Sequence, residues 1–236
     1  MKQTKFSEEV KTTPSLNKPY AKGPYNKFDD QEQWIRITEG CPNNCEYCRE
    51  TKENGAKPKY FEVPNIVRNS VKIMDMNLMY KADCIEILDK LGSQRVNSKI
   101  IHYELVCGID YRFMNQEKAN ALKRNRFKHI RLAWDHSIKE QKKIKECIKQ
   151  LVTAGYRSED IMVFMICNWR IPYEDNCMKL RLCLRWNVKA ADCWFDNQLP
   201  PNVKPIHWSH KQIKQFRKDV RVHNQLINFG IYPELK

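Results

Sequence analysis

The stretch Gly40-Cys41-Pro42-Asn43-Asn44-Cys45-Glu46-Tyr47-Cys48 spaces three cysteines by three and then two residues, directly after the strand-like segment 33–38. Three thiolates on one short loop are able to hold three irons of a cubane iron-sulfur cluster and leave the fourth iron without a protein ligand. Such an iron is open to a substrate or a cofactor. The spacing therefore predicts a 4Fe-4S cluster on Cys41, Cys45 and Cys48, with one iron free for chemistry.

Other interpretations of these cysteines explain the pattern less well. A structural zinc site needs four ligands, and the sequence has no second Cys-x2-Cys or His-x3-His pair. A disulfide framework is not expected, since the ten cysteines are scattered through a long chain without a secretory signal. A ferredoxin would have two-residue gaps first and a fourth cysteine close behind. Zinc and incidental cysteines remain as alternatives.

Length and composition fit one α/β domain. The chain has 236 residues, of which 42% are hydrophobic, which is enough for a single sizeable core. No apolar run approaches the ~20 residues of a membrane span, and residues 1–32 are polar without a signal-like apolar core. We therefore expect a soluble cytoplasmic protein without a membrane partner. Its first 32 residues are expected to form a polar, mobile extension, in which Tyr20, Tyr25 and Phe28 are the side chains able to pack onto the domain.

After the cysteine loop, short apolar segments alternate with longer amphipathic ones. Six such units predict an α/β fold with parallel strands, arranged as a partial (β/α)6 TIM-like barrel. The candidate strands are residues 34–38, 71–75, 100–107, 129–135, 161–167 and 188–195.

Helices are predicted between these strands by their apolar periodicity. The clearest one precedes the fifth strand and ends at Gly155, and the segments 82–91, closed by Gly92, 117–123 and 210–229 follow the same pattern. In the helix that precedes the fifth strand, the residues of the apolar face are Ile138, Ile144, Cys147, Ile148, Leu151 and Val152.

Strand phase indicates a polar interior. In the fourth strand Ile130, Leu132 and Trp134 alternate with Arg131 and Asp135, so the two charged side chains should share the face away from the helices. By the same argument, His102 and Glu104 face inward from the third strand. Inward charges are costly unless they pair or bind something, so they are either pocket residues or partners of one another. The carboxyl ends of the strands, where such barrels place their active sites, carry Asp75, Asn77, residues 107–110, Asp135, Asn168 and Asp196.

The cysteine motif resembles that of the radical S-adenosylmethionine (SAM) superfamily, Cys-x3-Cys-x2-Cys with an aromatic residue, here Tyr47, before the last cysteine. The resemblance runs from about residue 33 to 196. It implies a core barrel over 33–200, with the cluster loop after the first strand, and leaves a basic helical segment at 201–236.

Several cofactor contacts are implied by this resemblance. Tyr47 would pack near the adenine of SAM. The family often has a Gly-Gly-Glu-like motif at the end of the second strand for the SAM amine; this chain has no Gly-Gly pair and offers Asp75 and Asn77 instead. Arg131 or Asp135 would meet the SAM carboxylate or ribose.

The resemblance also implies an activity: reductive cleavage of SAM at the 4Fe-4S cluster, which yields a 5′-deoxyadenosyl radical that abstracts hydrogen from a substrate. The electron would come from a donor such as flavodoxin or ferredoxin. A small metabolite, a peptide and RNA all remain open as substrates.

Seven further cysteines lie outside the motif, and their irregular spacing does not predict a second cluster. Most are expected to be core thiols. Cys107, at the end of a strand, is a candidate substrate contact or radical relay, although a packed core thiol is the simpler interpretation. The others are Cys84, Cys147, Cys167, Cys177, Cys183 and Cys193.

Charge gives one hint about partners. Of the net charge of +14, residues 1–100 contribute 17 − 14 = +3 and residues 101–236 contribute 25 − 14 = +11. The basic C-terminal half is a candidate surface for nucleic acid or another polyanion, with an aromatic platform near Trp208. The alternative to an enzyme is therefore a zinc- or cluster-containing nucleic-acid-binding module without catalysis. The basic residues near Trp208 are Lys204, Lys211, Lys214, Arg217, Lys218 and Arg221, with His207 and His210 beside them.

Overall fold

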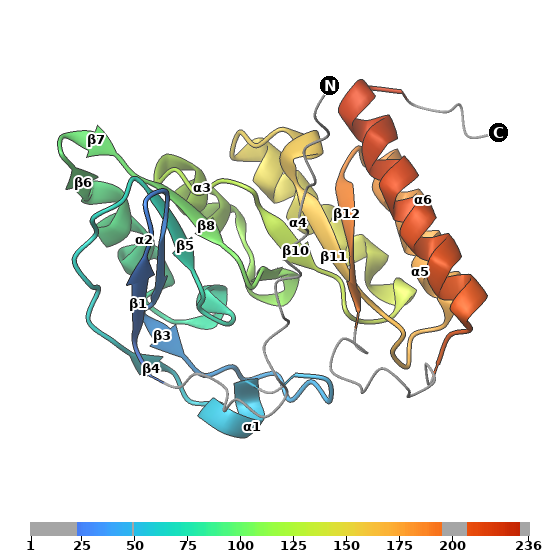
Figure 1. Ribbon diagram of the computed structural model, residues 1–236, viewed down its shortest axis with the longest axis horizontal. Helices are drawn as coiled ribbons and strands as arrows, with labels where there is room; N and C mark the ends of the chain where they lie inside the picture. Colours follow the sequence, from blue (N-terminus) through green and yellow to red (C-terminus); the bar gives the residue numbers. More distant parts are fainter. Residues whose placement is uncertain (1–22, 49, 195–206, 232–236) are drawn as a thin grey trace, which may run out of the picture.

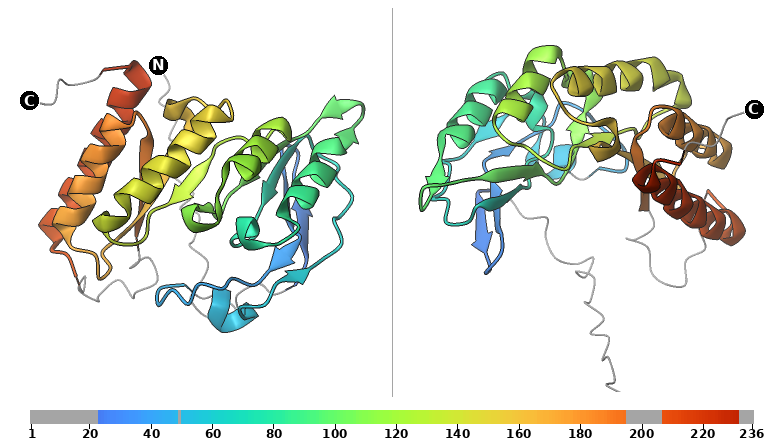
Figure 2. Two further views of the ribbon diagram at one scale, coloured as in Figure 1. Left: turned by 180° about the vertical axis from the view of Figure 1, so that it is seen from behind. Right: turned by 90° about the horizontal axis from the view of Figure 1, so that it is seen from above.

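The computed structural model describes residues 23–48, 50–194 and 207–231. Strands and helices alternate along most of this chain, and several of the helices lie along one face of the strands (Figures 1 and 2). The strands are β1 (Tyr25–Phe28), β2 (Gln33–Arg36), β3 (Thr38–Glu39), β4 (Lys59–Tyr60), β5 (Ser70–Ile73), β6 (Arg95–Val96), β7 (Lys99–Ile100), β8 (His102–Leu105), β9 (Ile109–Asp110), β10 (Arg131–Ala133), β11 (Met162–Cys167) and β12 (Lys189–Trp194). The α-helices are α1 (Glu50–Asn54), α2 (Cys84–Ser93), α3 (Gln116–Arg124), α4 (Gln141–Thr153), α5 (Tyr173–Arg185) and α6 (His210–Phe229). Short 3-10 helices are η1 (Leu78–Tyr80), η2 (Tyr111–Phe113), η3 (Ile138–Glu140) and η4 (Ser158–Asp160).

The predicted α/β fold with parallel strands is confirmed. Strands β2, β5 and β8 pair in parallel in one sheet, and β9, β10, β11 and β12 pair in parallel in another. One continuous ladder through the six predicted strands is not observed. After β8 the chain turns at Gly108 (φ +85°) and continues as β9, which occupies the hydrogen-bonding edge of β10. A single parallel bridge, Tyr103 to Phe127, remains beside this break, and closure as a partial barrel stays a prediction.

Part of the predicted N-terminal extension belongs to the first sheet. Strand β1 pairs antiparallel with β2, with Tyr25 opposite Arg36 and Phe28 opposite Gln33. The expected mobile segment is therefore wrong for residues 25–28, because backbone pairing with the edge of β2 orders a segment whose side chains are mostly exposed. Tyr20 lies outside the described residues.

Two details of the predicted helices differ from the structure. Gly92 lies inside α2 and does not end it. A Cβ at this position would overlap the side chain of Asn125 after α3, so the glycine permits close packing of the two helices. Of the predicted apolar face, the four residues from Ile144 to Leu151 are buried on α4, whereas Val152 is 43% exposed. The predicted first residue, Ile138, is half-buried and belongs to η3.

The edge strand β12 is covered by α6, which the sequence predicts with the observed bounds. Helix α6 lies beside β12 at one end of the molecule (Figure 1). The side chain of Asn224 accepts from the amide of Ala190 (2.9 Å) and donates to its carbonyl (2.8 Å), and His223 bonds the carbonyl of Val188 (2.8 Å). The helix thus satisfies backbone groups that an edge strand would otherwise expose.

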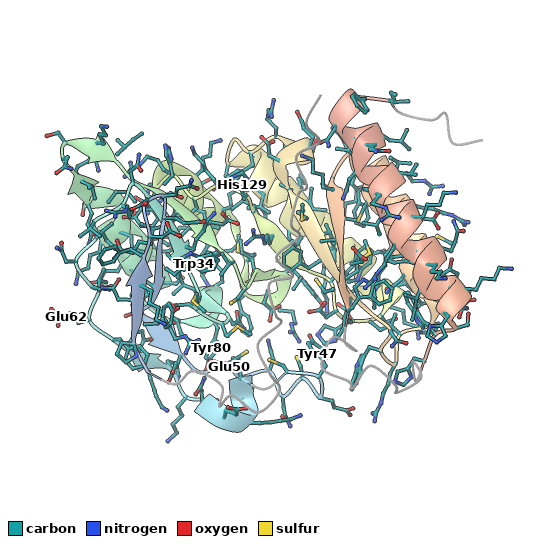
Figure 3. The ribbon with its side chains drawn as sticks, viewed as in Figure 1. Trp34, Tyr47, Glu50, Glu62, Tyr80 and His129 are labelled. Carbon is teal, nitrogen blue, oxygen red and sulfur yellow. The ribbon has the colours of Figure 1, made fainter. Side chains whose placement is uncertain are left out.

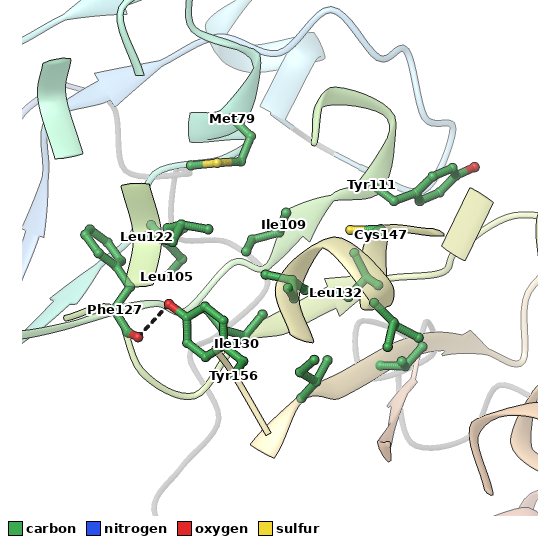
Figure 4. Packing of buried hydrophobic residues seen from close by; sticks show 14 of the residues in the cluster. Met79, Leu105, Ile109, Tyr111, Leu122, Phe127, Ile130, Leu132, Cys147 and Tyr156 are labelled. Atoms are coloured by element: carbon green, nitrogen blue, oxygen red, sulfur yellow. Dashed lines mark hydrogen bonds between the residues drawn. The ribbon is translucent and has the colours of Figure 1, made fainter. Parts of the chain in front are cut away.

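The core lies between the strands and the helices (Figure 4). Leu105 and Leu132 on the strands meet Leu122 and Cys147 on the helices, and all four are buried. The hydroxyl of Tyr156 donates a 2.9 Å hydrogen bond to the carbonyl of Phe127, which is drawn in Figure 4. Within the described part of the chain, no helix combines the length and the apolar character needed to cross a membrane.

Candidate cluster and cofactor site

The cysteine loop connects β3 to α1 at the carboxyl ends of the parallel strands. Cys41 is buried, and Cys45 and Cys48 are half-buried. All three line one cavity of about 120 Å³, the cysteine cavity, together with residues from the ends of β5, β9 and β10. The structure therefore brings the three predicted ligands to the same place.

The start of this loop has a backbone that only glycine adopts readily. Gly40 has φ +87°, and a Cβ there would overlap the carbonyl oxygen of Lys57. Its amide donates to Oε1 of the buried Glu50 (3.0 Å), and its carbonyl accepts from Nζ of Lys81. The hydroxyl of Thr51 shares its one proton between the carbonyls of Cys41 (3.1 Å) and Asn43 (2.6 Å), which fixes the next residues of the loop. Hydrogen bonds from α1 and from Lys81 therefore hold the first residues of the loop in place.

Lys81 is a buried cation behind the loop, with 1% of its surface exposed. Burial lowers its pKa, and the charges of Asp75, Cys41 and Glu50 oppose this shift. A lysine is rarely buried without a compensating negative group. Its position favours negative charge in the cysteine loop, such as a bound thiolate cluster would supply.

Tyr47 points from the loop toward the end of β10 (Figure 3). Its hydroxyl donates a 2.9 Å hydrogen bond to Oδ2 of Asp135, and both residues line the cysteine cavity. Burial and the neighbouring carboxylate raise the pKa of Tyr47, so the phenol remains a donor. Burial also raises the pKa of Asp135, opposed by this hydrogen bond and by the charge of Lys179 on α5. The predicted contacts Tyr47 and Asp135 thus form one unit.

Asp110, at the end of β9, is a site residue that the sequence pattern indicates only as the end of a strand. Its carboxylate accepts from Nδ2 of Asn43 (2.5 Å) in the cysteine loop and from Nδ2 of Asn77 (3.4 Å) after β5. Arg112 adds two further donors at 2.8 Å. Asn77 also donates to Sγ of Cys41 (3.3 Å), so the predicted residue Asn77 lies in the site. Arg112 and His136 line the cavity as well and were not predicted.

Asp75 lies behind the site rather than in it. Its side chain is 1% exposed and accepts a 2.9 Å hydrogen bond from the amide of Ile37, which fixes β2 against the end of β5. Burial raises its pKa to about 6. Asp75 is not among the residues that line the cysteine cavity.

Arg131 is also away from this cavity, because its guanidinium is paired deeper between the strands. It forms an ion pair with the buried Glu104, which pairs on its other side with Lys72. Mutual pairing, the alternative to ligand binding for the inward charges, therefore describes Arg131 and Glu104. Of the five predicted cofactor contacts, Tyr47, Asn77 and Asp135 come together, whereas Asp75 and Arg131 do not.

Two further cavities share walls with the cysteine cavity. One, the outer cleft, has a volume of about 540 Å³ and is bordered by Cys45, Tyr47, Asp135 and His136, with Trp169 and Arg170 beyond them. Its size is within the range of small-molecule sites. The other, the apolar cavity, has a volume of about 190 Å³ and shares Tyr47, Cys107, Ala133 and Asp135. Cys107 thus lines two cavities, and the simpler interpretation of it as a packed core thiol is wrong.

The donor set fits a cluster better than a single metal ion. In the described ranges, no three His, Cys, Asp or Glu side chains converge as ligands of one ion. A cubane cluster takes one thiolate on each of three irons, so its ligands need to surround a volume rather than a point. Three thiols around one cavity, next to the buried Lys81, meet that requirement.

The basic surface predicted near the C-terminus lacks the aromatic platform that the sequence predicts at Trp208. Arg217 and Arg221 on α6 are exposed, as are the lysines between residues 211 and 218. Trp208 is only 3% exposed and donates from Nε1 to the carbonyl of Ile171 (3.0 Å). It is not available as an aromatic platform, because its ring packs between α5 and α6. Lys204 lies outside the described residues.

Comparison with known proteins finds similarity in structure only. No family model and no curated protein match the sequence. Two solved structures of the radical SAM methyltransferase TsrM from Kitasatospora setae are similar to this chain at 12% sequence identity. One, with cobalamin and a [4Fe-4S] cluster, has a TM-score of 0.55 over 67% of this chain and 34% of that chain. The other, with tryptophan substrate and a SAM analogue, has a TM-score of 0.56 over 68% and 35%. This chain spans about a third of the length of that protein, and the likeness concerns the fold.

Proposed function

We propose that this protein is a radical SAM enzyme with a partial barrel core, which holds a 4Fe-4S cluster on Cys41, Cys45 and Cys48. The observation that carries the proposal is that these three thiols line one cavity at the carboxyl ends of the parallel strands. The motif spacing and the fold similarity to a radical SAM methyltransferase support it.

When bound, the 4Fe-4S cluster would supply one electron to SAM; loss of a carbon–sulfur bond would then give methionine and a 5′-deoxyadenosyl radical able to take hydrogen from a substrate. A donor such as flavodoxin or ferredoxin would provide the electron, and the cytoplasm is the proposed compartment.

The protein's own side chains bind and orient the cofactor. Tyr47, held by Asp135, presents its ring at the boundary of the cysteine cavity and the outer cleft, where it is placed to pack on the adenine. Asn77 is placed for polar contact near Cys41. Asp75 and Arg131 act indirectly in this proposal, since they hold the strand ends that carry these contacts. Fixed positions of this kind lower the entropic cost of bringing the reactants together.

The test is formation of 5′-deoxyadenosine by protein that is reconstituted with iron and sulfide under nitrogen and supplied with SAM and dithionite. Cys45→Ala should abolish both the brown iron-sulfur absorbance and 5′-deoxyadenosine. Cys84→Ala is the matched control, because Cys84 lies on α2 and is not among the residues of the cysteine cavity.

Two results would contradict the proposal. One is 5′-deoxyadenosine that persists in Cys45→Ala. The other is a colourless parent protein that binds zinc and leaves SAM intact, which would favour the binding-module alternative.

A further inference from the structure

The apolar cavity next to the cysteine cavity differs from its neighbours in charge. The cysteine cavity contains Arg112 and His136, and the outer cleft contains His136 and Arg170. Among the described residues that line the apolar cavity there is no lysine, arginine or histidine, and Asp135 is its one carboxylate. It therefore offers no counter-ion to a carboxylate or a phosphate.

Its walls follow from the pairing of three parallel strands. Ala133 on β10 is opposite Phe164 on β11, and Ile166 on β11 is opposite Cys193 on β12. Partners across a ladder, and residues two apart on a strand, point to the same face. The strands thus present a contiguous apolar surface beside Tyr47 and Asp135.

Two cations lie close to the walls of this cavity, and both have carboxylate partners. The guanidinium of Arg217 lies 4.6 Å from the centre of the Trp194 ring, and its Nε is 3.8 Å from Oδ2 of Asp192. The guanidinium of Arg131 lies 5.8 Å from the centre of the Phe164 ring, but it forms an ion pair with the buried Glu104. An arginine that is already paired with a carboxylate has little left to offer an anionic ligand.

We infer that the apolar cavity takes an uncharged aromatic ring of the substrate. Its volume of about 190 Å³ accommodates one flat ring system, since an apolar protein cavity of about 150 Å³ binds benzene. The hydroxyl or ring N–H of a phenol or an indole would find an acceptor in Asp135. We assign the ring to the substrate because the apolar cavity shares Tyr47, Cys107, Ala133 and Asp135 with the cysteine cavity. This assignment rests on the proposed function. The preference for a neutral ring does not rest on it.

The test compares phenol, indole and benzoate as probes by ligand-observed saturation-transfer NMR on the full purified chain. Phenol and indole should bind at least about tenfold more tightly than benzoate, because an unpaired carboxylate would be desolvated there at a cost above about 1.4 kcal/mol. Cys193→Leu, which adds bulk to the wall, should weaken phenol binding several-fold. Cys177→Leu, on α5 and not among the residues of this cavity, is the matched control.

If Cys193→Leu does not fold, Phe164→Leu provides a second variant, because it enlarges the cavity and should shift the preference from phenol toward indole. Benzoate binding equal to phenol, or phenol binding that is unchanged in both variants, would overturn the inference. The 5′-deoxyadenosine assay on the parent protein separates the two proposals. Product without ring binding contradicts only the inference. Ring binding without product contradicts the proposed function, and with it the assignment of the ring to a substrate, but not the preference of the cavity for a neutral ring.

Discussion

The hydroxyl of Tyr47 donates a 2.9 Å hydrogen bond to Asp135, which joins the cysteine loop to the end of strand β10 across 88 positions of sequence. The bond lies where the cysteine cavity, the outer cleft and the apolar cavity meet. A contact at this junction fixes the tyrosine ring relative to three separate binding surfaces. In the proposed enzyme, this one pair of side chains would connect the cluster, cofactor and substrate sites.

Tyr47→Phe keeps the ring and removes this bond. We expect SAM to bind roughly fivefold more weakly, since a buried hydrogen bond contributes about 1 kcal/mol, while the iron content stays unchanged. Isothermal titration with SAM on the reconstituted protein measures the effect. Tyr156→Phe is the control, because it removes a different hydrogen-bonded tyrosine hydroxyl, which donates to the carbonyl of Phe127 and does not border the cavities. Equal SAM affinity in parent and Tyr47→Phe would show that the bond does not orient the ring.

Gly40 and Gly55 offer a matched pair for the loop backbone. Both have positive φ, +87° and +81°, but only at Gly40 does a Cβ meet backbone, at the carbonyl of Lys57. Gly55→Ala should cost about 1–2 kcal/mol of unfolding free energy from left-handed strain alone. Gly40→Ala should cost more and reduce bound iron, because the cysteine loop must move. Urea unfolding and iron analysis test this, and equal losses in the two variants would contradict it.

Local signals made α6 and the cysteine loop predictable. Helix α6 starts at a capping box between Ser209 and Gln212 and ends at Gly230 with φ +63°, so residues next to each end determine its bounds. The cysteine motif is likewise a local pattern. Helix α5 was not predicted as such, because its buried face carries Asn176 and Lys179, which interrupt an apolar periodicity.

Contacts between distant residues were beyond a sequence argument. Asp110 meets Asn43 over 67 positions, and only the packing of β9 against the loop reveals it. Strand phase correctly placed Arg131 on the inner face but did not distinguish pairing with Glu104 from binding a cofactor, since both satisfy a buried charge. The alternation of side chains along a strand predicts which face of the sheet a residue lies on. Which residue it pairs with depends on tertiary packing.

Lys179 provides a prediction about buried charge. It is fully buried on α5, donates to the carbonyl of Trp134 (3.2 Å) and has its pKa lowered by burial to about 8, with Asp135 opposing the shift. Lys179→Met should destabilise the fold by about 3 kcal/mol, because it leaves the carboxylate of Asp135 without its compensating charge. Asp135→Asn in the same chain should restore part of this loss.

Urea unfolding of the two single variants and the double variant gives the coupling energy between these residues. Arg181→Met removes an exposed cation from the same helix and serves as the control. Strictly additive losses would show that Lys179 supports the helix by packing and not through Asp135.

His223 should make the docking of α6 on β12 sensitive to pH. Its ring is 4% exposed, and Nε2 lies 2.8 Å from the carbonyl of Val188. Burial lowers its pKa below the ordinary 6.5, and the bond to Val188 offsets only part of the shift. Below pH 6.5 the unfolded chain therefore binds a proton that the folded chain does not. The stability contributed by the neutral ring is complete above pH 6.5 and declines as the pH falls toward the lowered pKa, by at most about 1.4 kcal/mol per pH unit.

His223→Gln should reduce the slope of the unfolding free energy between pH 7 and pH 5 relative to the parent, as measured by urea unfolding at each pH. His210→Gln, at an exposed position on the same helix, is the control for loss of a histidine. If parent and His223→Gln show the same slope, the ring does not titrate with unfolding, and α6 is held to β12 by Asn224 and its apolar face alone.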